Sequence, residues 1–282
     1  MKILILGSSG ILSKTLQLYL SKKNIDFLTI SRERNSNRNF YLKNISNFKN
    51  LEQLIFKIKP KYIINCIGVT KFNNTYKNKK LTILLNSKMP IYLAELCKLN
   101  KIYFLHISTD CVFSGKKGNY SDNSYKDTKD LYGLSKNKGE VKNKFTATIR
   151  TSFIGPELNT KKSLLCWFLN EENFVRGYNK AFFSGLTSLE LCKIIYNYFI
   201  KKNILQNKII NIGSRRISKF TLLTKIRKIF KKKINIVRYQ NFTIDRSLDS
   251  KKFRKLTGYK VVGWDKMLLE LKRFMINNNY KF

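Results

Sequence analysis

The sequence predicts an α/β fold in which a doubly wound parallel sheet is joined to a smaller C-terminal lobe. Short apolar runs alternate with segments of helical spacing through the first 150 residues or so. Glycines close two of these runs, at Gly7 and Gly68, as expected where a buried strand ends in a tight turn. Strands that alternate with helices pair in parallel through right-handed crossovers, so these observations together indicate a parallel sheet covered on two faces.

The N-terminal half supplies most of this pattern. The strands expected here are Lys2–Leu6, Ile25–Ile30, Phe40–Leu42, Tyr62–Ile67, Ile102–Ile107 and Thr146–Arg150. The helices expected between them are Ile11–Leu20, Leu51–Ile58, Leu81–Leu99 and Leu131–Lys144. Pro60 ends the second helix, and the third should kink or break just before Pro90.

The pattern loosens after about Thr151. Helices are expected at Leu164–Leu169, Leu189–Phe199 and Phe220–Phe230, and strands at Ile209–Ile212 and Ile234–Val237. We therefore expect a dinucleotide-binding domain over residues 1–153 and a substrate-binding lobe over 154–282, with some segments of the lobe returning to the sheet. No Gly, Ser or Pro linker separates the two parts, so they should share an interface.

The chain is strongly basic, with 56 Lys and Arg against 17 Asp and Glu and a net charge of +39. These residues are spread along the whole sequence, which is also rich in Lys, Asn and Ile, so an A+T-rich genome accounts for the charge without a function. A general affinity for small anions is the alternative. We therefore expect no nucleic-acid partner, although phosphate neutralisation is what such basicity suits best.

Composition and spacing also bear on the compartment. A run of about 18 apolar residues would be needed to span a membrane, and none is present. The N-terminal apolar run is short and breaks at Gly7, unlike a signal peptide. The five cysteines are widely spaced without a Cys-x-x-Cys pair, which predicts reduced thiols, no metal site and a cytoplasmic location.

A glycine-rich turn is expected between the first strand and the first helix, in the sequence Gly7-Ser8-Ser9-Gly10-Ile11-Leu12-Ser13. Glycines let the backbone approach a pyrophosphate closely, and the helix N-terminus offers free N–H groups and a positive dipole end. Ser13 stands where a third, packing glycine is usual. The alternative is a tight turn without a ligand, but its position after the first strand favours dinucleotide binding.

The end of the second strand bears on which dinucleotide is bound. Proteins that prefer NAD place an acid there for the ribose hydroxyls. Here Ser31 stands close to that position, and Arg32 follows it. A guanidinium suits the 2′-phosphate of NADP, so the sequence favours NADP and leaves NAD open.

Tyr132 and Lys136 lie four residues apart, on one face of an expected helix. An ammonium beside the phenol would lower its pKa from about 10 toward working pH, so that Tyr132 could protonate a carbonyl oxygen as hydride arrives. Thr109, at the carboxyl end of the fifth strand, could hydrogen-bond that oxygen. His106 is the single histidine, and we interpret it as a core imidazole with satisfied hydrogen bonds rather than a catalytic base.

These motifs, in this order, resemble the extended short-chain dehydrogenase/reductases and, among them, the dTDP-4-dehydrorhamnose reductase family of sugar-nucleotide reductases. The resemblance rests chiefly on Ser108-Thr109-Asp110-Cys111-Val112-Phe113-Ser114-Gly115, Leu131-Tyr132-Gly133-Leu134-Ser135-Lys136 and Asn65-Cys66-Ile67-Gly68. It is strong to about Gly155 and looser beyond.

The resemblance implies a Rossmann-like domain and an NADP-dependent oxidoreductase that reduces a 4-keto sugar nucleotide for surface-polysaccharide synthesis. It implies catalytic roles for Thr109, Tyr132 and Lys136. The cofactor-binding residues it implies are Gly7, Ser9, Gly10, Ile11, Leu12, Ser31, Arg32, Asn44, Asn65, Cys66, Ile67 and Gly68, with Tyr132 and Lys136. It places substrate binding at Asp110, Cys111 and Phe113, and it leaves a homodimer open.

Some features depart from the family. Cys111 stands where these reductases commonly have Tyr, which leaves the sugar open. Two other functions therefore stay as alternatives. One is an epimerase or dehydratase of the same superfamily, and the other is a non-catalytic dinucleotide-binding module that acts as a regulatory subunit.

Overall fold

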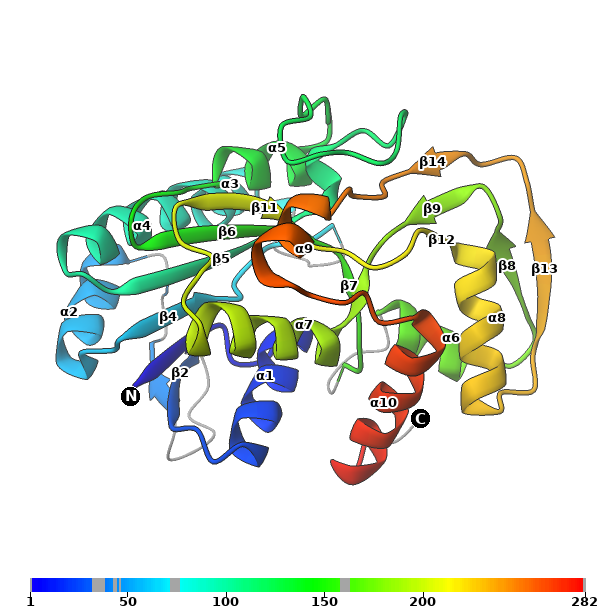
Figure 1. The fold of residues 1–282 in the computed structure, drawn as a ribbon, viewed down its shortest axis with the longest axis horizontal. Helices are drawn as coiled ribbons and strands as arrows, with labels where there is room; N and C mark the ends of the chain where they lie inside the picture. The colour runs from blue at the N-terminus through cyan, green and yellow to red at the C-terminus, as the bar shows by residue number, and fades with distance from the viewer. Residues whose placement is uncertain are drawn as a thin grey trace.

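A parallel sheet of seven strands forms the centre of the molecule, in the order β11-β6-β5-β4-β1-β2-β3 (Figure 1). The computed structural model describes residues 2–31, 39–42, 45, 47–71, 77–157 and 163–280. The strands of this sheet are β1 (Ile3–Leu6), β2 (Phe27–Ser31), β3 (Asn39–Tyr41), β4 (Tyr62–Asn65), β5 (Tyr103–Thr109), β6 (Thr146–Thr151) and β11 (Lys208–Asn211). The α/β fold predicted from the alternation is confirmed.

Helices cover both faces of the sheet because alternate side chains of each strand point to opposite sides. In β1, Ile3 and Ile5 belong to the apolar cluster formed with α1 (Ile11–Lys22), α7 (Ser188–Ile194) and α10 (Trp264–Asn277). Leu4 and Leu6 belong to the cluster on the other face, with α2 (Phe48–Ile58) and α4 (Met89–Leu99). This two-sided burial explains why the strands read as continuous apolar runs.

The long helix expected at Leu81–Leu99 is built from three consecutive pieces. It begins as α3 (Lys79–Ile83), passes through a π-helical segment (Leu84–Lys88) and continues as α4. The π-helical segment ends at Lys88, two residues before Pro90, close to the point where the sequence predicts a kink or break.

Helix α5 (Leu131–Lys138) is shorter than the predicted Leu131–Lys144. Gly139 follows it at a close approach of two backbones, where an added Cβ would lie 2.0 Å from the carbonyl oxygen of Asn86. Beyond it, Glu140 turns its carboxylate to Arg150 on β6. Tertiary contacts end this helix, and they cannot be inferred from its own periodicity.

In its described residues, the C-terminal half adds α6 (Leu164–Asn170), α8 (Lys219–Phe230), α9 (Lys251–Thr257) and three small sheets. The small sheets pair β7 (Phe153–Ile154) with β10 (Leu186–Thr187), β8 (Phe174–Tyr178) with β13 (Asn235–Tyr239), and β9 (Ala181–Phe183) with both β12 (Ile217–Ser218) and β14 (Ile244–Asp245). Much of this material lies beyond one end of the main sheet (Figure 1). β11 instead returns to the main sheet and pairs in parallel with β6.

No helix in the described part of the chain is long and apolar enough to cross a membrane.

Candidate active site

The carboxyl ends of β1, β4 and β5 meet at one edge of the sheet, because all three strands run in parallel. The strand order reverses between β1 and β4, since β2 and β3 lie on one side of β1 and the later strands lie on the other. Open α/β sheets bind ligands in the crevice at such a reversal. The predicted motifs that follow these three strands therefore lie at one edge.

The turn after β1 is shaped by Gly7 and Gly10. Gly7 has φ +89°, and an added Cβ would lie 2.9 Å from Cγ1 of Ile67, so a larger residue is excluded on both counts. Gly10 is the N-cap of α1 and offers no side chain to bond the first amides of the helix. Among the described residues, no atom lies within 4 Å of a Cβ added at Gly10.

This turn fits a pyrophosphate. The first N–H groups of α1 have no side-chain cap, and they open onto free space beside Gly10. Ser9 and Gly10 are exposed, whereas Leu12 is buried and could offer only its backbone. Ser13 is buried and accepts a hydrogen bond from Nε2 of Gln17 at 3.1 Å, so it replaces a packing glycine without clash.

The segment after β4 brings the predicted ribose-binding residues toward α5. Asn65 is fully buried, Cys66 and Ile67 are half-buried, and Gly68 is exposed. A Cβ added at Gly68 would lie 3.7 Å from Nζ of Lys136. The segment is therefore positioned to flank a group bound beside that lysine.

Thr109 and Tyr132 converge at this edge. The Thr109 hydroxyl accepts from the N–H of Cys111 at 3.1 Å and also hydrogen-bonds the Tyr132 phenol. Gly133 lets α5 approach this closely, because an added Cβ would lie 2.2 Å from the carbonyl oxygen of Cys111. Asp130 caps the helix, accepting from the N–H of Gly133 at 3.0 Å. A hydroxyl and a half-buried phenol thus stand together, as the sequence predicts.

The pKa of Tyr132 is shifted in the direction opposite to the one predicted from its spacing to Lys136. Burial raises the pKa of Tyr132 above its ordinary value, and the neighbouring Cys111 raises it further, while the bond from Thr109 lowers it. The Nζ of Lys136 donates to the carbonyl oxygen of Ile107 at 2.6 Å and lies 3.3 Å from Nε2 of His106. The predicted lowering of the phenol pKa is therefore wrong for this arrangement, because the lysine is bonded to β5 instead.

Lys136 is itself unusual, since its amine is buried. Burial lowers its pKa to about 8, although Glu140 and Cys66 act in the opposite direction. The buried imidazole of His106 has its pKa lowered well below 6.5, first by burial and then by Lys136. His106 is thus an uncharged core imidazole with partners on both nitrogens, as predicted.

The predicted substrate-binding residues divide into two kinds. Asp110 and Cys111 follow Thr109 in a short 3₁₀-helix (Asp110–Val112), next to the Tyr132 phenol. Phe113 requires a correction. Its ring is 0% exposed and stacks on Tyr120 at 4.2 Å, so its side chain is core and has no surface for a substrate.

Two cations that the sequence did not assign to the site face this region. Arg246 donates to the carbonyl oxygen of Phe113 at 3.1 Å and to the sulfur of Cys111 at 3.5 Å. Burial raises the pKa of Asp110, while Arg246 and Lys219 both lower it. Nothing in the sequence distinguishes either residue among 56 Lys and Arg, because only the fold of the C-terminal half brings them here.

Other predicted residues are not placed by the structure. Arg32 and Asn44 lie outside the described residues, and of Ser31 only the backbone, at the end of β2, is described. Within the described ranges, no group of three or more His, Cys, Asp or Glu side chains could hold a metal ion.

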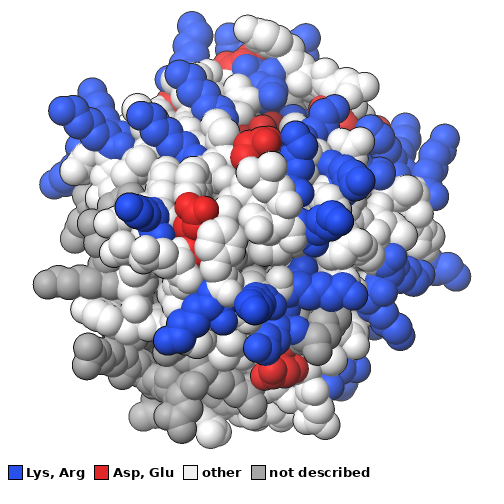
Figure 2. All heavy atoms as spheres, turned by 90° about the vertical axis from the view of Figure 1, so that its left-hand side faces the viewer, with Lys and Arg blue, Asp and Glu red and all other residues white. Residues whose placement is uncertain are grey.

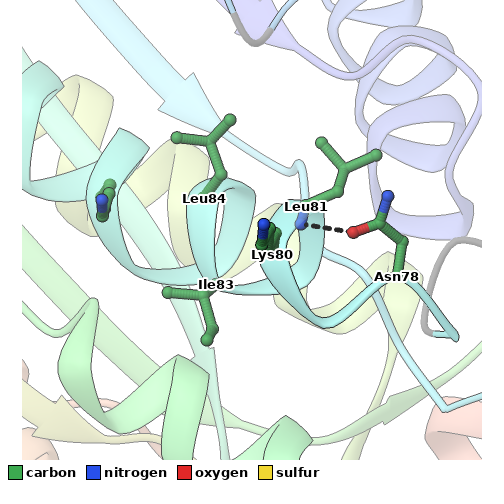
Figure 3. Close-up of a pocket in the computed structure, with 6 residues that line it drawn as sticks. Asn78, Lys80, Leu81, Ile83 and Leu84 are labelled. Atoms are coloured by element: carbon green, nitrogen blue, oxygen red, sulfur yellow. Dashed lines mark hydrogen bonds between the residues drawn. The ribbon is translucent and has the colours of Figure 1, made fainter.

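A separate hollow lies on α3 and the π-helical segment that follows it (Figure 3). Asn78 caps α3 there, accepting from the N–H of Leu81 at 3.0 Å. The remaining lining residues are Lys80, Ile83, Leu84 and Lys88, which are aliphatic or basic. Among its described lining residues, the hollow therefore lacks the acid and hydroxyl groups found beside Thr109. On the face drawn in Figure 2, Lys and Arg side chains are spread widely rather than gathered over one element.

Comparison with known proteins gives matches of three kinds. The model of the RmlD substrate binding domain family matches residues 1–167. The chain is 25% identical over 138 residues to dTDP-4-keto-6-deoxy-D-glucose reductase of Streptomyces niveus, which is 49% of this chain and 45% of that protein. It is 27% identical over 140 residues to methionine adenosyltransferase 2 subunit beta of Danio rerio, which is 49% of this chain and 42% of that protein. The chain thus spans about half the length of these curated relatives.

Solved structures match over almost the whole chain. A hypothetical dTDP-4-dehydrorhamnose reductase from Sulfolobus tokodaii has a TM-score of 0.77 and 27% identity, covering 94% of this chain and 98% of that one. The dTDP-4-dehydrorhamnose reductase of Bacillus anthracis in complex with NADP has a TM-score of 0.81 and 21% identity, covering 97% and 99%. At that identity the second likeness shows the fold alone.

Proposed function

The chain belongs to the RmlD substrate binding domain family, and on that premise we propose that it is an NADPH-dependent reductase of the 4-keto group of a nucleotide-linked deoxysugar. The observation that carries the proposal is the meeting of the Thr109 hydroxyl and the Tyr132 phenol beside the glycine turn and the buried Lys136. The names of the two reductases among the relatives support the same substrate class. We extend the proposal to a role in surface-polysaccharide synthesis.

In this proposal the dinucleotide is held along the edge of the sheet. The N–H groups that begin α1 would bind its pyrophosphate, because the N-cap residue Gly10 has no side chain to bond them and no described atom fills the room beside it. Cys66, Ile67 and Gly68 would flank the nicotinamide ribose together with Lys136, and Arg32 would bind a 2′-phosphate. The predicted ribose contact of the Asn65 side chain is corrected, because that side chain is fully buried and bonded to Ile67 and His106. When bound, the nicotinamide supplies hydride to the keto carbon.

In this proposal, the Thr109 hydroxyl and the Tyr132 phenol act on the keto oxygen of the substrate. The Thr109 hydroxyl would donate a hydrogen bond to that oxygen and so orient the carbonyl beside the phenol. Tyr132 would supply the proton that the oxygen needs once the carbon has accepted hydride, which leaves an alcohol and a phenolate. Because burial raises its pKa, the Tyr132 phenol is protonated at neutral pH. It therefore carries the proton that it would donate to the keto oxygen.

The charge around the site favours an anionic substrate. Arg246 and Lys219 lie close enough to Asp110 to influence its titration, and Arg246 also touches the sulfur of Cys111. Positive charge on this side of the catalytic pair would attract the diphosphate of a nucleotide sugar. We therefore propose that the diphosphate of the sugar nucleotide binds on the side of the 3₁₀-helix where these two cations lie.

The test is an assay of NADPH consumption with 4-keto-deoxysugar nucleotides that carry different bases. Replacing Tyr132 by Phe should lower kcat by about 10²–10⁴-fold while the Kd for NADPH changes little, because only the proton donor is lost. Tyr125→Phe is the matched control, since that side chain is 86% exposed, and it should leave kcat unchanged.

The same assay distinguishes the alternatives. An epimerase or dehydratase would convert the sugar without net loss of NADPH. The similarity to a subunit beta favours, as a second candidate, a non-catalytic dinucleotide-binding subunit. Such a protein would bind NADPH yet turn over none of the substrates, and Tyr132→Phe would then have no effect.

A further inference from the structure

Three buried side chains form a continuous chain of contacts beneath the site. Asn65 on β4 and His106 on β5 are neighbours in register, with 3.1 Å between Nδ2 of Asn65 and Nδ1 of His106. On the other side of the ring, Nε2 of His106 lies 3.3 Å from Nζ of Lys136 on α5. Asn65 and His106 are 0% exposed and Lys136 is 3% exposed, so water does not compete for these bonds.

The backbone fixes the orientation of the Asn65 amide. Its Oδ1 accepts from the N–H of Ile67 at 3.0 Å, so the oxygen must face that donor and the NH₂ group must face the ring. An NH₂ group donates, and Nδ1 of His106 must therefore be the unprotonated, accepting nitrogen. A neutral imidazole carries one proton, which leaves it on Nε2.

The proton on Nε2 then points at Lys136. The lysine amine already donates to the carbonyl oxygen of Ile107 at 2.6 Å. An uncharged amine has one lone pair and can accept from Nε2–H while it donates to Ile107. An ammonium has no lone pair and would set N–H against N–H.

We propose that His106 is a positioning residue for the reaction proposed above: Asn65 holds it as the Nε2–H tautomer, and in that form it stabilises the uncharged amine of Lys136. The proposal rests on the proposed function for its catalytic meaning, but the tautomer itself does not. As a consequence, Lys136 can release and regain a proton near neutral pH. It lies one helical turn from Tyr132, whose phenol gives up a proton in each cycle of the proposed reduction.

The other ionisable groups around Lys136 do not account for the lowering of its pKa. Glu140, beyond the end of α5, and Cys66, after β4, both act to raise the pKa of Lys136. His106 is the titratable group that β5 presents to the amine. Burial lowers the pKa of Lys136 to about 8. In our proposal, the proton on Nε2 of His106 adds to this effect, because it favours the uncharged amine.

The test uses the single histidine of the chain, which makes one imidazole spectrum unambiguous. In the full chain labelled with ¹⁵N-histidine and without added cofactor, NMR should show the proton on Nε2 and a bare Nδ1. The Nε2 signal should shift with an inflection near pH 8, the titration of Lys136, and Lys136→Met should abolish that inflection. A proton on Nδ1, or a wild-type spectrum without this inflection, would overturn the proposal.

A substitution at Asn65 tests whether this residue sets the tautomer of His106. Asn65→Asp keeps an oxygen for the Ile67 N–H and places a second acceptor against Nδ1, so the imidazole proton should move to Nδ1. The Lys136 inflection should then rise by roughly 1 pH unit or more, since its neighbour becomes an acceptor and a carboxylate is added. Asn100→Asp, an exposed site at the end of α4, is the control that should leave the spectrum unchanged.

The spectrum needs neither cofactor nor substrate, so its outcome is independent of the reductase assay. Loss of activity on every sugar nucleotide with the predicted tautomer intact would refute the function alone. Activity with the proton on Nδ1 would refute this inference alone. Should Asn65→Asp fail to fold, the wild-type and Lys136→Met spectra still decide the tautomer and its partner.

Discussion

Replacing Glu140 by Gln removes one charge from an ion pair that is almost completely buried. The Glu140 carboxylate accepts from Nε and Nη2 of Arg150, each at 2.8 Å, and from the Ser108 hydroxyl at 2.9 Å. The Arg150 and Glu140 side chains are 3% and 1% exposed. The substitution keeps the volume of Glu140, so it tests the charge rather than the packing.

The expected loss of stability comes from the Arg150 guanidinium, which stays buried after the substitution. Without the carboxylate, the Arg150 guanidinium is a buried cation whose main counter-charge is gone, and breaking such a pair from one side costs about 3–5 kcal/mol. Lys126 also lies 3.4 Å from Glu140 but is 32% exposed, so water can solvate it. We expect the free energy of unfolding to fall by about 3 kcal/mol, because the Gln amide keeps one acceptor.

Urea unfolding of the purified protein measures this difference directly. The matched control is Glu95→Gln, whose carboxylate lies 3.6 Å from Lys98 in a pair with side chains 61% and 54% exposed. That substitution should change the free energy of unfolding by about 0.5 kcal/mol or less. Equal effects of the two substitutions would refute the view that burial makes the Glu140–Arg150 pair important for stability.

Four further predictions concern the cofactor, the glycine turn and pH. Arg32→Ala should raise the Kd for NADPH far more than that for NADH, and equal losses would remove Arg32 from the 2′-phosphate. Gly7→Ala should destabilise the chain by about 1 kcal/mol or more, because its φ is +89° and a Cβ would meet Ile67. Gly10→Ala should leave stability unchanged in the same unfolding assay but weaken NADPH binding, since its Cβ would enter the space assigned to the pyrophosphate. His106 has a pKa well below 6.5 when folded, so the unfolded chain binds the extra proton. Stability should therefore fall as the pH drops below 6.5, by up to about 1.4 kcal/mol per unit, and His106→Gln should flatten this slope in unfolding curves at pH 7 and 5.5.

The parallel sheet could be predicted because its strands are buried on both faces and its turns carry glycine. Most strands of the small C-terminal sheets could not, because strands as short as Ile217–Ser218 leave no measurable alternation. The exception is β13, which overlaps the strand predicted at Ile234–Val237. Helix α5 ends at Lys138 through contacts of Gly139 and Glu140 with other elements, which the helix's own spacing does not encode.

The candidate site divides in the same way. Thr109, Tyr132 and Lys136 could be found because each stands in a motif of fixed spacing at the end of a predicted element. Phe113 belongs to the same motif as Thr109, yet its ring packs on Tyr120 in the core. A sequence motif gives the order of residues but not the direction in which each side chain points. Arg246 comes from a distant segment, so only the folded chain shows it beside Cys111.

The pairing of β11 with β6 makes the two halves of the polypeptide interdependent for folding. A fragment that stopped near residue 167 would keep six strands of the main sheet but leave the β6 edge, Thr146–Thr151, with open hydrogen-bonding groups. It would also strip α7 and α10 from the cluster that contains Ile3 and Ile5. Unpaired edges and bare apolar faces promote aggregation, so such a fragment should be insoluble rather than a self-sufficient module. Synthesis must therefore run well past the nucleotide-binding motifs before the sheet that carries them can close.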